Sequence, residues 1–318
     1  MKILITGITG FVGRELAKSI VSQNKYTVLG LSRSETDLPV KCLNIGDLSP
    51  TTNYQNILKD VDVVIHLAAR VHKMQDTSED PLSDFRNVNC ATTLNLAKQS
   101  SFAGVKRFIY LSSIKVSGEF SNPNKPFGLN DTIDLNSPLI KMKDPYAVSK
   151  LECEIGLHSI SEKSNMGVVI IRPPLVYGKE VKGNFSSLLN LTKISLPLPF
   201  SGIENKRSLV YVKNLVSLIS LVVEHPKADG EIFLVSDDKD ISTSNLIRII
   251  YSASGKKAKL FKVPKSIFKI CFYTIGKSGL YNRLFNNLQV DISATKEKLG
   301  WTPPHSLEEG IYETVSCD

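Results

Sequence analysis

The stretch KILITGITGFVG, residues 2–13, decides the fold of this chain. Its first five residues form a short apolar run of the kind found in buried strands. Gly7, Gly10 and Gly13 follow, and an apolar pattern with helical spacing begins after them. A strand, a glycine turn and a helix in this order let the backbone approach a pyrophosphate, whose charge the helix N-terminus stabilises. We therefore predict a dinucleotide site, although Gly-x-x-Gly-x-x-Gly differs from the commoner Gly-x-Gly-x-x-Gly spacing.

Strand and helix patterns alternate beyond this stretch. Further strands are expected at Thr27–Ser32, Lys41–Asn44, Asp62–Leu67, Arg107–Ser112, Gly167–Arg172 and Glu231–Val235. Helices are expected between them at Leu82–Ala103, Tyr146–Ser164 and Tyr211–Glu224. The alternation predicts an α/β protein, with a Rossmann-type doubly wound parallel sheet and a smaller, mostly helical C-terminal substrate domain. Ligands of such sheets bind at the carboxyl ends of the strands.

The pattern changes after about Tyr177. A helix is expected at Lys182–Ile194, followed by a proline-punctuated loop at Leu196–Phe200. We expect residues 1–176 and 207–240 to form the Rossmann domain, and residues 177–206 and 241–318 to form a substrate-binding lid domain. The cleft between the two is where we expect a ligand.

Composition excludes several classes of protein. Of the 318 residues, 42% are hydrophobic and 22% are charged, which is ordinary for a globular protein. No apolar run is long enough to span a bilayer, and because the first strand opens at Lys2 we expect no signal peptide. The net charge of +8 comes without basic runs that interleave with aromatic residues, so we expect no nucleic acid partner.

Cysteine usage points to a reduced compartment. The cysteines are scattered, odd in number and free of Cys-x-x-Cys spacing: Cys42, Cys90, Cys153, Cys271 and Cys317. We therefore expect a cytoplasmic protein with neither a disulfide framework nor a metal site.

Tyr146 and Lys150 are the candidate chemical groups. They stand four residues apart on a predicted helix and so share one face. An ammonium near a phenol favours the phenolate, so Lys150 is expected to lower the Tyr146 pKa from about 10. A tyrosine tuned in this way serves as a proton donor and acceptor. Such pairs also occur on ordinary helix surfaces, so the surrounding motifs decide their meaning.

Those motifs resemble the extended short-chain dehydrogenase/reductase family, in its nucleotide-sugar epimerase and reductase branch. The resemblance runs from Met1 to about Leu307. It rests on Gly7-x-x-Gly10-x-x-Gly13, Asp47-Leu48, His66–Ala69, Asn89 with Thr93, Ser112-Ser113, Tyr146-x-x-x-Lys150, Arg172–Gly178 and Arg207–Val212.

The resemblance implies a role for each matching residue. Tyr146 is expected to be the acid/base, Lys150 to lower its pKa and hold the nicotinamide ribose, and Ser113 to hydrogen-bond the reacting oxygen. The expected cofactor contacts are Gly7, Thr9, Gly10, Phe11, Val12, Gly13, Ser32, Arg33, Asp47, Leu48, Leu67, Ala68, Ala69, Asn89, Tyr146, Lys150 and Pro173. The expected substrate contacts are Lys115, Asn184, Arg207 and Arg283.

Several of these residues have a plainer interpretation. Asp47 would also serve as a turn or helix-capping residue, and Arg207 as a surface residue, although a guanidinium suits a diphosphate. Lys115 either touches a sugar substituent or points to solvent. His66 is expected to satisfy a buried hydrogen bond, because Tyr146 already supplies the chemistry.

The second strand bears on the choice of cofactor. An acidic residue at its end would bind the ribose 2′-hydroxyl of NAD, whereas an arginine accommodates a 2′-phosphate. The strand ends in Ser32-Arg33-Ser34, without a carboxylate. NADP is therefore favoured over NAD, and NAD stays open because Glu35 and Asp37 lie close by.

Together these features imply redox chemistry at C4 of a UDP-sugar, with NAD(P), by a protein we expect to be a homodimer. We favour a 4-keto-6-deoxy-hexosamine reductase of surface-polysaccharide synthesis, since Arg70-Val71-His72 and Ser113–Val116 resemble such a subgroup. The alternative is a UDP-glucose or UDP-N-acetylglucosamine 4-epimerase. A 4,6-dehydratase is disfavoured because Ile114-Lys115 replaces its Asp-Glu pair. An alternative from a different class of protein is a non-catalytic NADP-binding regulator. Such a protein would be expected to lack Tyr146 or Lys150.

The segment Pro264–Lys277 places apolar residues between lysines. We expect it to be a lid helix that packs on the core or on a partner subunit. The alternative is a helix lying on a membrane surface, without stable insertion.

Overall fold

A computed structural model describes residues 1–70, 80–137, 144–191 and 196–316, and its centre is one parallel sheet. Its strands are β1 (Lys2–Thr6), β2 (Thr27–Ser32), β3 (Lys41–Asn44), β4 (Val63–His66), β5 (Arg107–Leu111), β6 (Gly167–Arg172) and β10 (Ile232–Leu234). They lie in the order β10-β6-β5-β4-β1-β2-β3. The chain reverses direction across the sheet between β1 and β4, which is the doubly wound arrangement. The Rossmann-type fold is therefore confirmed.

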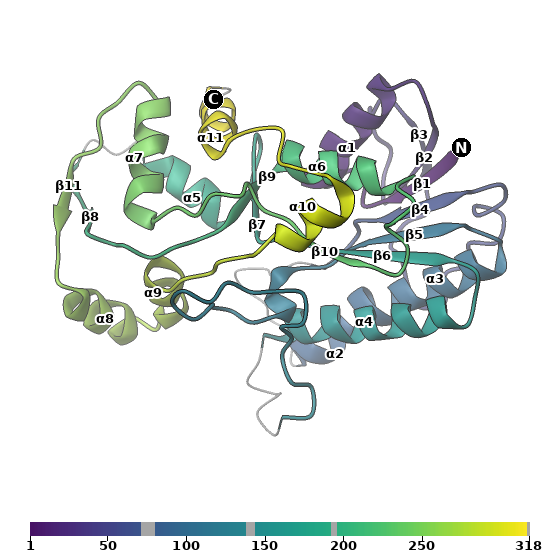
Figure 1. Ribbon diagram of the computed structural model, residues 1–318, viewed down its shortest axis with the longest axis horizontal. Helices are drawn as coiled ribbons and strands as arrows, with labels where there is room; N and C mark the ends of the chain where they lie inside the picture. Colours follow the sequence, from purple (N-terminus) through teal and green to yellow (C-terminus); the bar gives the residue numbers. More distant parts are fainter. Residues whose placement is uncertain (71–79, 138–143, 192–195, 317–318) are drawn as a thin grey trace.

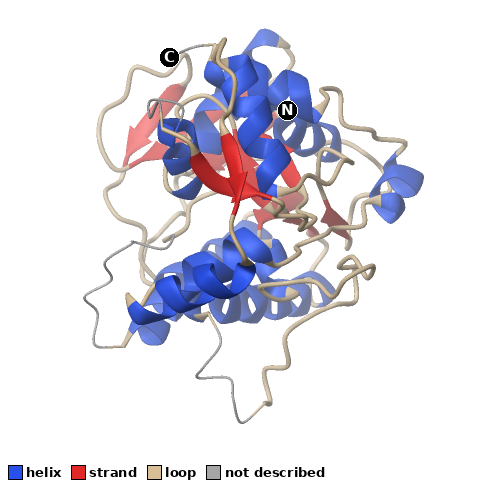
Figure 2. Cartoon of the chain, turned by 90° about the vertical axis from the view of Figure 1, so that its left-hand side faces the viewer, coloured by secondary structure: helices blue, strands red, loops and turns tan. Residues whose placement is uncertain are grey.

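Helices cover both faces of the sheet. α1 (Phe11–Ser22) and α6 (Val212–Val222) pack together on one face, and α3 (Thr92–Phe102) and α4 (Pro145–Glu162) pack together on the other (Figure 1). Turned by 90°, the strands lie between two layers of helices (Figure 2). β1 explains the need for both layers, because Ile3 and Ile5 enter one buried cluster and Leu4 enters the other. Alternate side chains of a strand point to opposite faces, so a continuous apolar strand must be covered twice.

The helix expected at Leu82–Ala103 is interrupted. It consists of α2 (Pro81–Phe85), the π-helical segment η1 (Arg86–Ala91) and α3 in direct succession. Both the backbone N–H and the side-chain hydroxyl of Thr92 donate to the carbonyl of Asn87, five residues back. This wider turn is rare in proteins and is frequent at functional sites. It carries Asn89 on the helix surface that faces the site described below.

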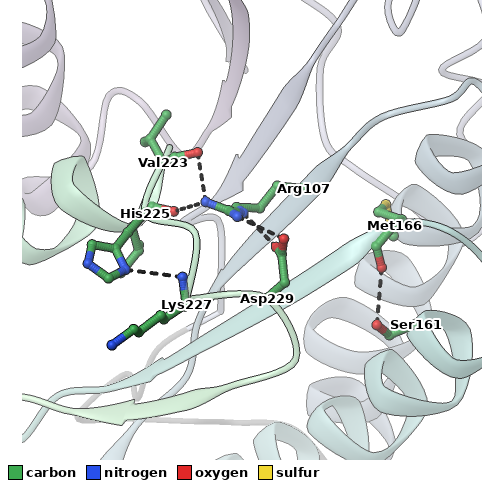
Figure 3. A network of polar contacts seen from close by, with 8 residues as sticks. Arg107, Ser161, Met166, Val223, His225, Lys227 and Asp229 are labelled. Atoms are coloured by element: carbon green, nitrogen blue, oxygen red, sulfur yellow. Dashed lines mark hydrogen bonds and ion pairs between the residues drawn. The ribbon is translucent and has the colours of Figure 1, made fainter. Parts of the chain in front are cut away.

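The amino edge of the sheet is held by Arg107 at the start of β5. Its guanidinium donates to both carboxylate oxygens of Asp229, at 2.6 and 2.8 Å, and to the carbonyls of Val222 and Val223, at 2.6 and 3.0 Å (Figure 3). A cation at the C-terminal end of α6 meets the negative end of the helix dipole. The network fixes the turn before β10 at the edge opposite the ligand-binding one.

The C-terminal part carries short elements around two small sheets. These elements are β7 (Leu175–Tyr177), α5 (Asn184–Leu191), β8 (Leu198–Ser201), β9 (Leu209–Tyr211), α7 (Thr243–Ala253), β11 (Leu260–Lys262), α8 (Lys265–Thr274), α9 (Ser278–Phe285), α10 (Ser293–Leu299) and α11 (Leu307–Val315). The last residues of the helix expected at Lys182–Ile194 lie outside the described part of the chain. The proposed division into two domains stays a prediction.

The loop expected at Leu196–Phe200 is wrong in part, because β8 begins at Leu198 and pairs in parallel with β11. Leu198 is buried against Ile247 and Tyr251, and its N–H donates to the carbonyl of Lys259 at 2.8 Å. The flanking prolines lack only their own donors, so they are tolerated in a two-stranded edge pair. Among the described residues, no helix combines the length and the apolar character needed to cross a membrane.

Candidate active site

The glycine turn between β1 and α1 forms a backbone cradle. Gly7 has φ +68° and its carbonyl accepts from the N–H of Gly10 at 2.9 Å. A Cβ on Gly13 would come within 2.3 Å of the Gly7 carbonyl oxygen, so a side chain there would push the turn apart. Gly10 caps α1 without a side-chain hydrogen bond, which leaves the first N–H groups of the helix, from Phe11 and Val12 on, directed at an anion. The cradle fits a pyrophosphate.

The ends of β2 and β3 bring the predicted adenine-side residues together. Arg33 and Asp47 form an ion pair at 3.6 Å, and both side chains are largely exposed. Ser32 is buried and its hydroxyl donates to the carbonyl of Leu43, while Leu48 packs against the core behind it. The charge of Arg33 is thus partly balanced by a carboxylate from the neighbouring strand.

His66 at the end of β4 has a structural role, as expected. Its Nδ1 lies 2.7 Å from the hydroxyl of Thr6 and its Nε2 lies 2.8 Å from the hydroxyl of Thr93. Burial, followed by the nearby charge of Lys150, lowers the pKa of His66 to about 3, so the ring is neutral. The Thr6 hydroxyl also accepts from the N–H of Ala68, which places the Leu67–Ala69 backbone beside the glycine turn.

Asn89 holds the chain that leaves β4. Its Oδ1 accepts from the N–H of Arg70 at 2.7 Å, and its Nδ2 donates to the Arg70 carbonyl at 3.0 Å and to the Ser149 hydroxyl at 3.4 Å. The amide therefore links the loop after Ala69 to α4 and positions that loop. Direct contact of Asn89 with a cofactor stays a prediction. Val71 and His72 lie outside the described residues.

Ser113, Tyr146 and Lys150 meet at the carboxyl end of β5. Ser113 caps a single 3₁₀ turn, η2 (Ile114–Val116), with its Oγ accepting from the N–H of Lys115 at 3.3 Å. Tyr146 lies in the first turn of α4 and Lys150 one turn later. Lys150 Nζ donates to the carbonyl of Leu111 at 2.8 Å and lies 5.8 Å from the centre of the Tyr146 ring. Pro173 borders the same place, because its carbonyl accepts from the N–H of Ile114.

The expected lowering of the Tyr146 pKa is not found. Burial raises the pKa of Tyr146 above its ordinary value, the charge of Asp144 adds to the rise, and a hydrogen bond with Ser113 opposes it. Burial lowers the pKa of Lys150 to about 8, so it stays mostly charged at neutral pH. The protein alone therefore keeps Tyr146 protonated.

Lys115 pairs with a carboxylate beside the acid/base residue, and its contact with a sugar substituent stays a prediction. Its Nζ forms an ion pair with Oδ2 of Asp144 at 2.5 Å and lies 5.8 Å from the centre of the Tyr146 ring. Oδ1 of the same Asp144 accepts from the N–H of Tyr146 at 3.0 Å and so caps α4. Lys115 is thus bound to the residue next to the acid/base and retains about a third of its exposure, 38%.

Sequence reasoning missed Asp144, although a signal was present. An aspartate followed by a proline is the common start of a helix, with the side chain as cap and the proline at the first helical position. Asp144-Pro145 has this form. It also missed a buried network behind the site, where Arg172 donates to both oxygens of Glu154 and the carboxylate accepts from Ser112.

Arg207 and Arg283, two of the predicted substrate contacts, lie together. The Nη1 of Arg207 donates to the carbonyls of Arg283 and Asn286, at 3.1 and 3.3 Å. Burial, and then the neighbouring charge of Arg283, lower the pKa of Arg207 to about 10, so it stays charged near neutral pH. Two adjacent cations repel each other unless an anion joins them, as a diphosphate would. Asn184 begins α5, but its side chain is outside what the structure describes.

A Rossmann-type sheet with a glycine cradle and a Ser, Tyr and Lys set at the end of β5 defines a short-chain dehydrogenase/reductase enzyme, with NAD(P) as its cofactor class. The sequence profile of the NAD dependent epimerase/dehydratase family matches residues 3–236. The chain belongs to that family.

Individual relatives cover nearly the whole chain. A UDP-glucose 4-epimerase from Vibrio cholerae is 45% identical over 317 residues, 99% of this chain and 94% of the relative. The N-acetyl-alpha-D-glucosaminyl-diphospho-ditrans,octacis-undecaprenol 4-epimerase of Escherichia coli O157:H7 is 25% identical, over 99% of this chain and 95% of the relative. Among solved structures, a UDP-glucuronic acid 4-epimerase from Bacillus cereus in complex with NAD has a TM-score of 0.76 at 22% identity, over 100% of this chain and 99% of that chain. This last likeness concerns the fold.

Proposed function

We propose that the protein is an NAD-dependent 4-epimerase of a UDP-hexose or UDP-N-acetylhexosamine. The observation that carries the proposal is the 45% identity to a UDP-glucose 4-epimerase over almost the whole chain, combined with a site in which a single tyrosine provides acid/base chemistry. The turn η2 directly after Ser113 consists of Ile114, Lys115 and Val116, so it lacks the acidic pair that a 4,6-dehydratase is expected to carry there. The favoured function thus moves from the ketoreductase to the alternative in the sequence analysis.

The residues of the site suggest how the reaction proceeds. NAD, when bound, supplies the hydride acceptor and a positive charge close to Tyr146. Tyr146 removes the proton of the C4 hydroxyl as the C4–H bond breaks, and Ser113 donates a hydrogen bond to the reacting oxygen. For epimerisation the 4-keto sugar would turn over and regain the hydride on the other face of C4, and Tyr146 would return the proton to the oxygen. Atoms and electrons balance within one substrate, so no external reductant is needed.

The surrounding charges tune the proton transfer. The pKa of Tyr146 is raised by burial and by Asp144 in the protein alone, so the phenol stays protonated until a cation arrives. An oxidised nicotinamide, when bound beside Tyr146, would supply such a charge. This arrangement keeps the base inactive without cofactor. The Gly7–Gly13 cradle, Leu67–Ala69 and the Arg33–Asp47 pair are proposed to hold the cofactor, and Arg207 with Arg283 and Asn184 are proposed to hold the substrate diphosphate.

Products of purified protein incubated with UDP-glucose, or with UDP-N-acetylglucosamine, and followed by NMR test the proposal. A galacto-configured product without added cofactor is the expected result. The 4-keto-6-deoxy-hexosamine reductase is the second candidate, favoured because β2 ends in Ser32 and is followed by Arg33, so the strand itself supplies no carboxylate for a ribose 2′-hydroxyl. It predicts NADPH consumption with the keto sugar and no turnover of UDP-glucose. A protein inert with all three sugars contradicts both.

Cofactor preference separates the same two candidates. Arg33 forms an ion pair with Asp47, so part of its charge is already balanced and less is left for a 2′-phosphate. We therefore propose NAD for the epimerase, and NADP stays tied to the reductase. Dissociation constants for NAD and NADP, with Arg33→Ala beside the wild type, test this choice. An affinity for NADP that exceeds that for NAD and falls with Arg33→Ala would favour the reductase.

We also propose a cytoplasmic homodimer. Val88 on η1 and Ile155 on α4 are exposed apolar residues on adjacent elements of one face, which suits a helical interface between two copies. Sedimentation of the wild type and of Ile155→Glu tests it, with a dimer that the variant weakens as the expected result.

A further inference from the structure

The positive charge of the chain is concentrated in one C-terminal stretch. Residues 241–290 contain nine Lys and Arg residues and no Asp or Glu, whereas the whole chain contains 39 basic and 31 acidic residues. Outside the stretch, 30 basic residues face 31 acidic ones, so the rest of the protein is close to neutral. Seven lysines of the stretch are exposed: Lys256, Lys257, Lys259, Lys262, Lys265, Lys269 and Lys277. They lie on and around β11, α8 and α9, at the end of the molecule far from β3 (Figure 1).

Exposed apolar side chains are concentrated in the same place. Half of the large hydrophobic residues exposed in the described part of the chain fall within residues 261–280. They are Phe261, Ile267, Ile270, Tyr273, Ile275 and Leu280, with exposed fractions between 39% and 63%. Folded monomers rarely leave apolar side chains together in water unless another surface covers them. We call these six residues and the seven lysines the α8 face.

The helix α8 carries apolar residues on two opposite sides. Phe268 and Phe272, four residues apart, stack at 6.2 Å between ring centres, and Phe268 packs against Phe200 and Phe285. Ile267 and Ile270, three residues apart, are 49% and 63% exposed. Residues spaced by three or four share one side of a helix, so the inner side is already packed against Phe200 and Phe285. The outer side is an apolar surface that packing within this chain does not explain.

The charge of the α8 face indicates what kind of surface covers its apolar side chains. A second copy docked symmetrically on the α8 face would bring two clusters of lysines together without a carboxylate between them. An anionic lipid surface meets both features, because its headgroups attract lysines and the acyl boundary accepts isoleucine and aromatic side chains. We propose that the α8 face docks the protein on the surface of an anionic lipid bilayer. The contact is peripheral, and the substrate chemistry at Tyr146 does not depend on it.

Flotation of the full-length protein with vesicles tests the proposal. Phosphatidylcholine vesicles are compared with vesicles that also contain phosphatidylglycerol. We expect the wild type to float with the phosphatidylglycerol vesicles, less with phosphatidylcholine alone, and less again as salt screens the lysines. The double variant Ile267→Ser/Ile270→Ser is expected to partition at least about tenfold more weakly, since it removes two side chains from the acyl boundary. Lys269→Gln/Lys277→Gln is expected to reduce only the part that depends on phosphatidylglycerol.

Two controls match these changes elsewhere on the protein. Phe102→Ser removes a side chain that is 91% exposed on α3, and Lys18→Gln/Lys98→Gln removes two exposed lysines of α1 and α3. Both are expected to float as the wild type does. Because the altered residues of the α8 face are exposed, thermal unfolding should match the wild type, and turnover of a soluble UDP-sugar should be unchanged.

Several results overturn the proposal. These are wild type that stays at the bottom of the gradient with phosphatidylglycerol vesicles, an isoleucine variant that floats as well as wild type, or binding that is indifferent to phosphatidylglycerol. An oligomer that the isoleucine variant dissociates shows that a second copy covers the face, and overturns it too. Loss of turnover in every preparation counts against the proposed epimerase and leaves the flotation result intact.

Discussion

The carboxyl edge of the sheet and the α8 face place charge in opposite ways. Around Tyr146, charged groups are paired, as the half-buried Lys115 is with the buried Asp144, and as the buried Glu154 is with Arg172. On the α8 face, the lysines are exposed beside exposed isoleucines, and residues 241–290 contain no Asp or Glu. Burial makes each charge near Tyr146 a determinant of proton transfer. Exposure makes each lysine of the α8 face a weak contributor that acts only with its neighbours and with an external surface.

The largest effect is expected at Tyr146 itself. Tyr146→Phe removes the proton donor and acceptor, and kcat should fall by about a thousandfold. NAD binding and the melting temperature should stay near those of the wild type, because the ring still packs on Phe85. Steady-state kinetics with UDP-glucose give the comparison, and Tyr110→Phe, which keeps its ring 4.5 Å from Lys150 Nζ, is the matched control. A Tyr146→Phe enzyme with full activity would refute the mechanism.

The glycine cradle comes next. Gly13→Ala places a Cβ within 2.3 Å of the Gly7 carbonyl oxygen, and forcing the turn open should cost about 2 kcal/mol, or roughly thirtyfold in the Kd for NAD. Calorimetric titration measures it. Gly230→Ala is the control, since it also disturbs a turn but meets no atom within 4 Å. Equal NAD affinities for the two variants would show that the cradle is not the pyrophosphate site.

Removing the charge of Asp144 and removing that of Lys115 should shift the pH–kcat profile in opposite directions. Asp144→Asn keeps a capping side chain but removes the charge that raises the Tyr146 pKa. The acidic limb of the pH–kcat profile should therefore move to lower pH, by about one unit. Lys115→Met leaves Asp144 without its ammonium and should move the limb to higher pH. If both variants lowered kcat equally at every pH, Asp144 and Lys115 would have only a structural role.

The smallest effect concerns His66. The pKa of His66 in the folded protein is about 3, below the ordinary 6.5. Between these two pH values, His66 is therefore protonated in the unfolded chain and neutral in the folded protein. The stability contributed by neutral His66 is complete above pH 6.5 and is lost as the pH falls towards 3. On acidification, the free energy of unfolding of His66→Gln should fall less than that of the wild type. The difference should be on the order of 1 kcal/mol in mildly acidic buffer. Urea titrations across pH measure this slope, and an unchanged slope contradicts the buried neutral ring.

Some features of these two regions could be predicted from the sequence, and others could not. The strands, the glycine turn and the Ser113, Tyr146 and Lys150 set were predictable, because strand periodicity and short-range spacing are local properties of a chain. The sign of the Tyr146 pKa shift was not, since it depends on how deeply the ring is buried and on the charge of the neighbouring Asp144. The interruption at η1 was missed because one threonine, Thr92, decides it through a five-residue hydrogen bond. Only the folded chain reveals which side of α8 is already packed.

The fate of the C4 hydrogen tests the central claim most directly. UDP-glucose labelled with deuterium at C4 is incubated with the purified protein and unlabelled NAD, and the product is examined by NMR. We expect UDP-galactose that retains deuterium at C4, because in an epimerase the hydride would leave and return within one bound substrate. Product that has lost the label to the NAD in solution, or no product at all, would contradict it.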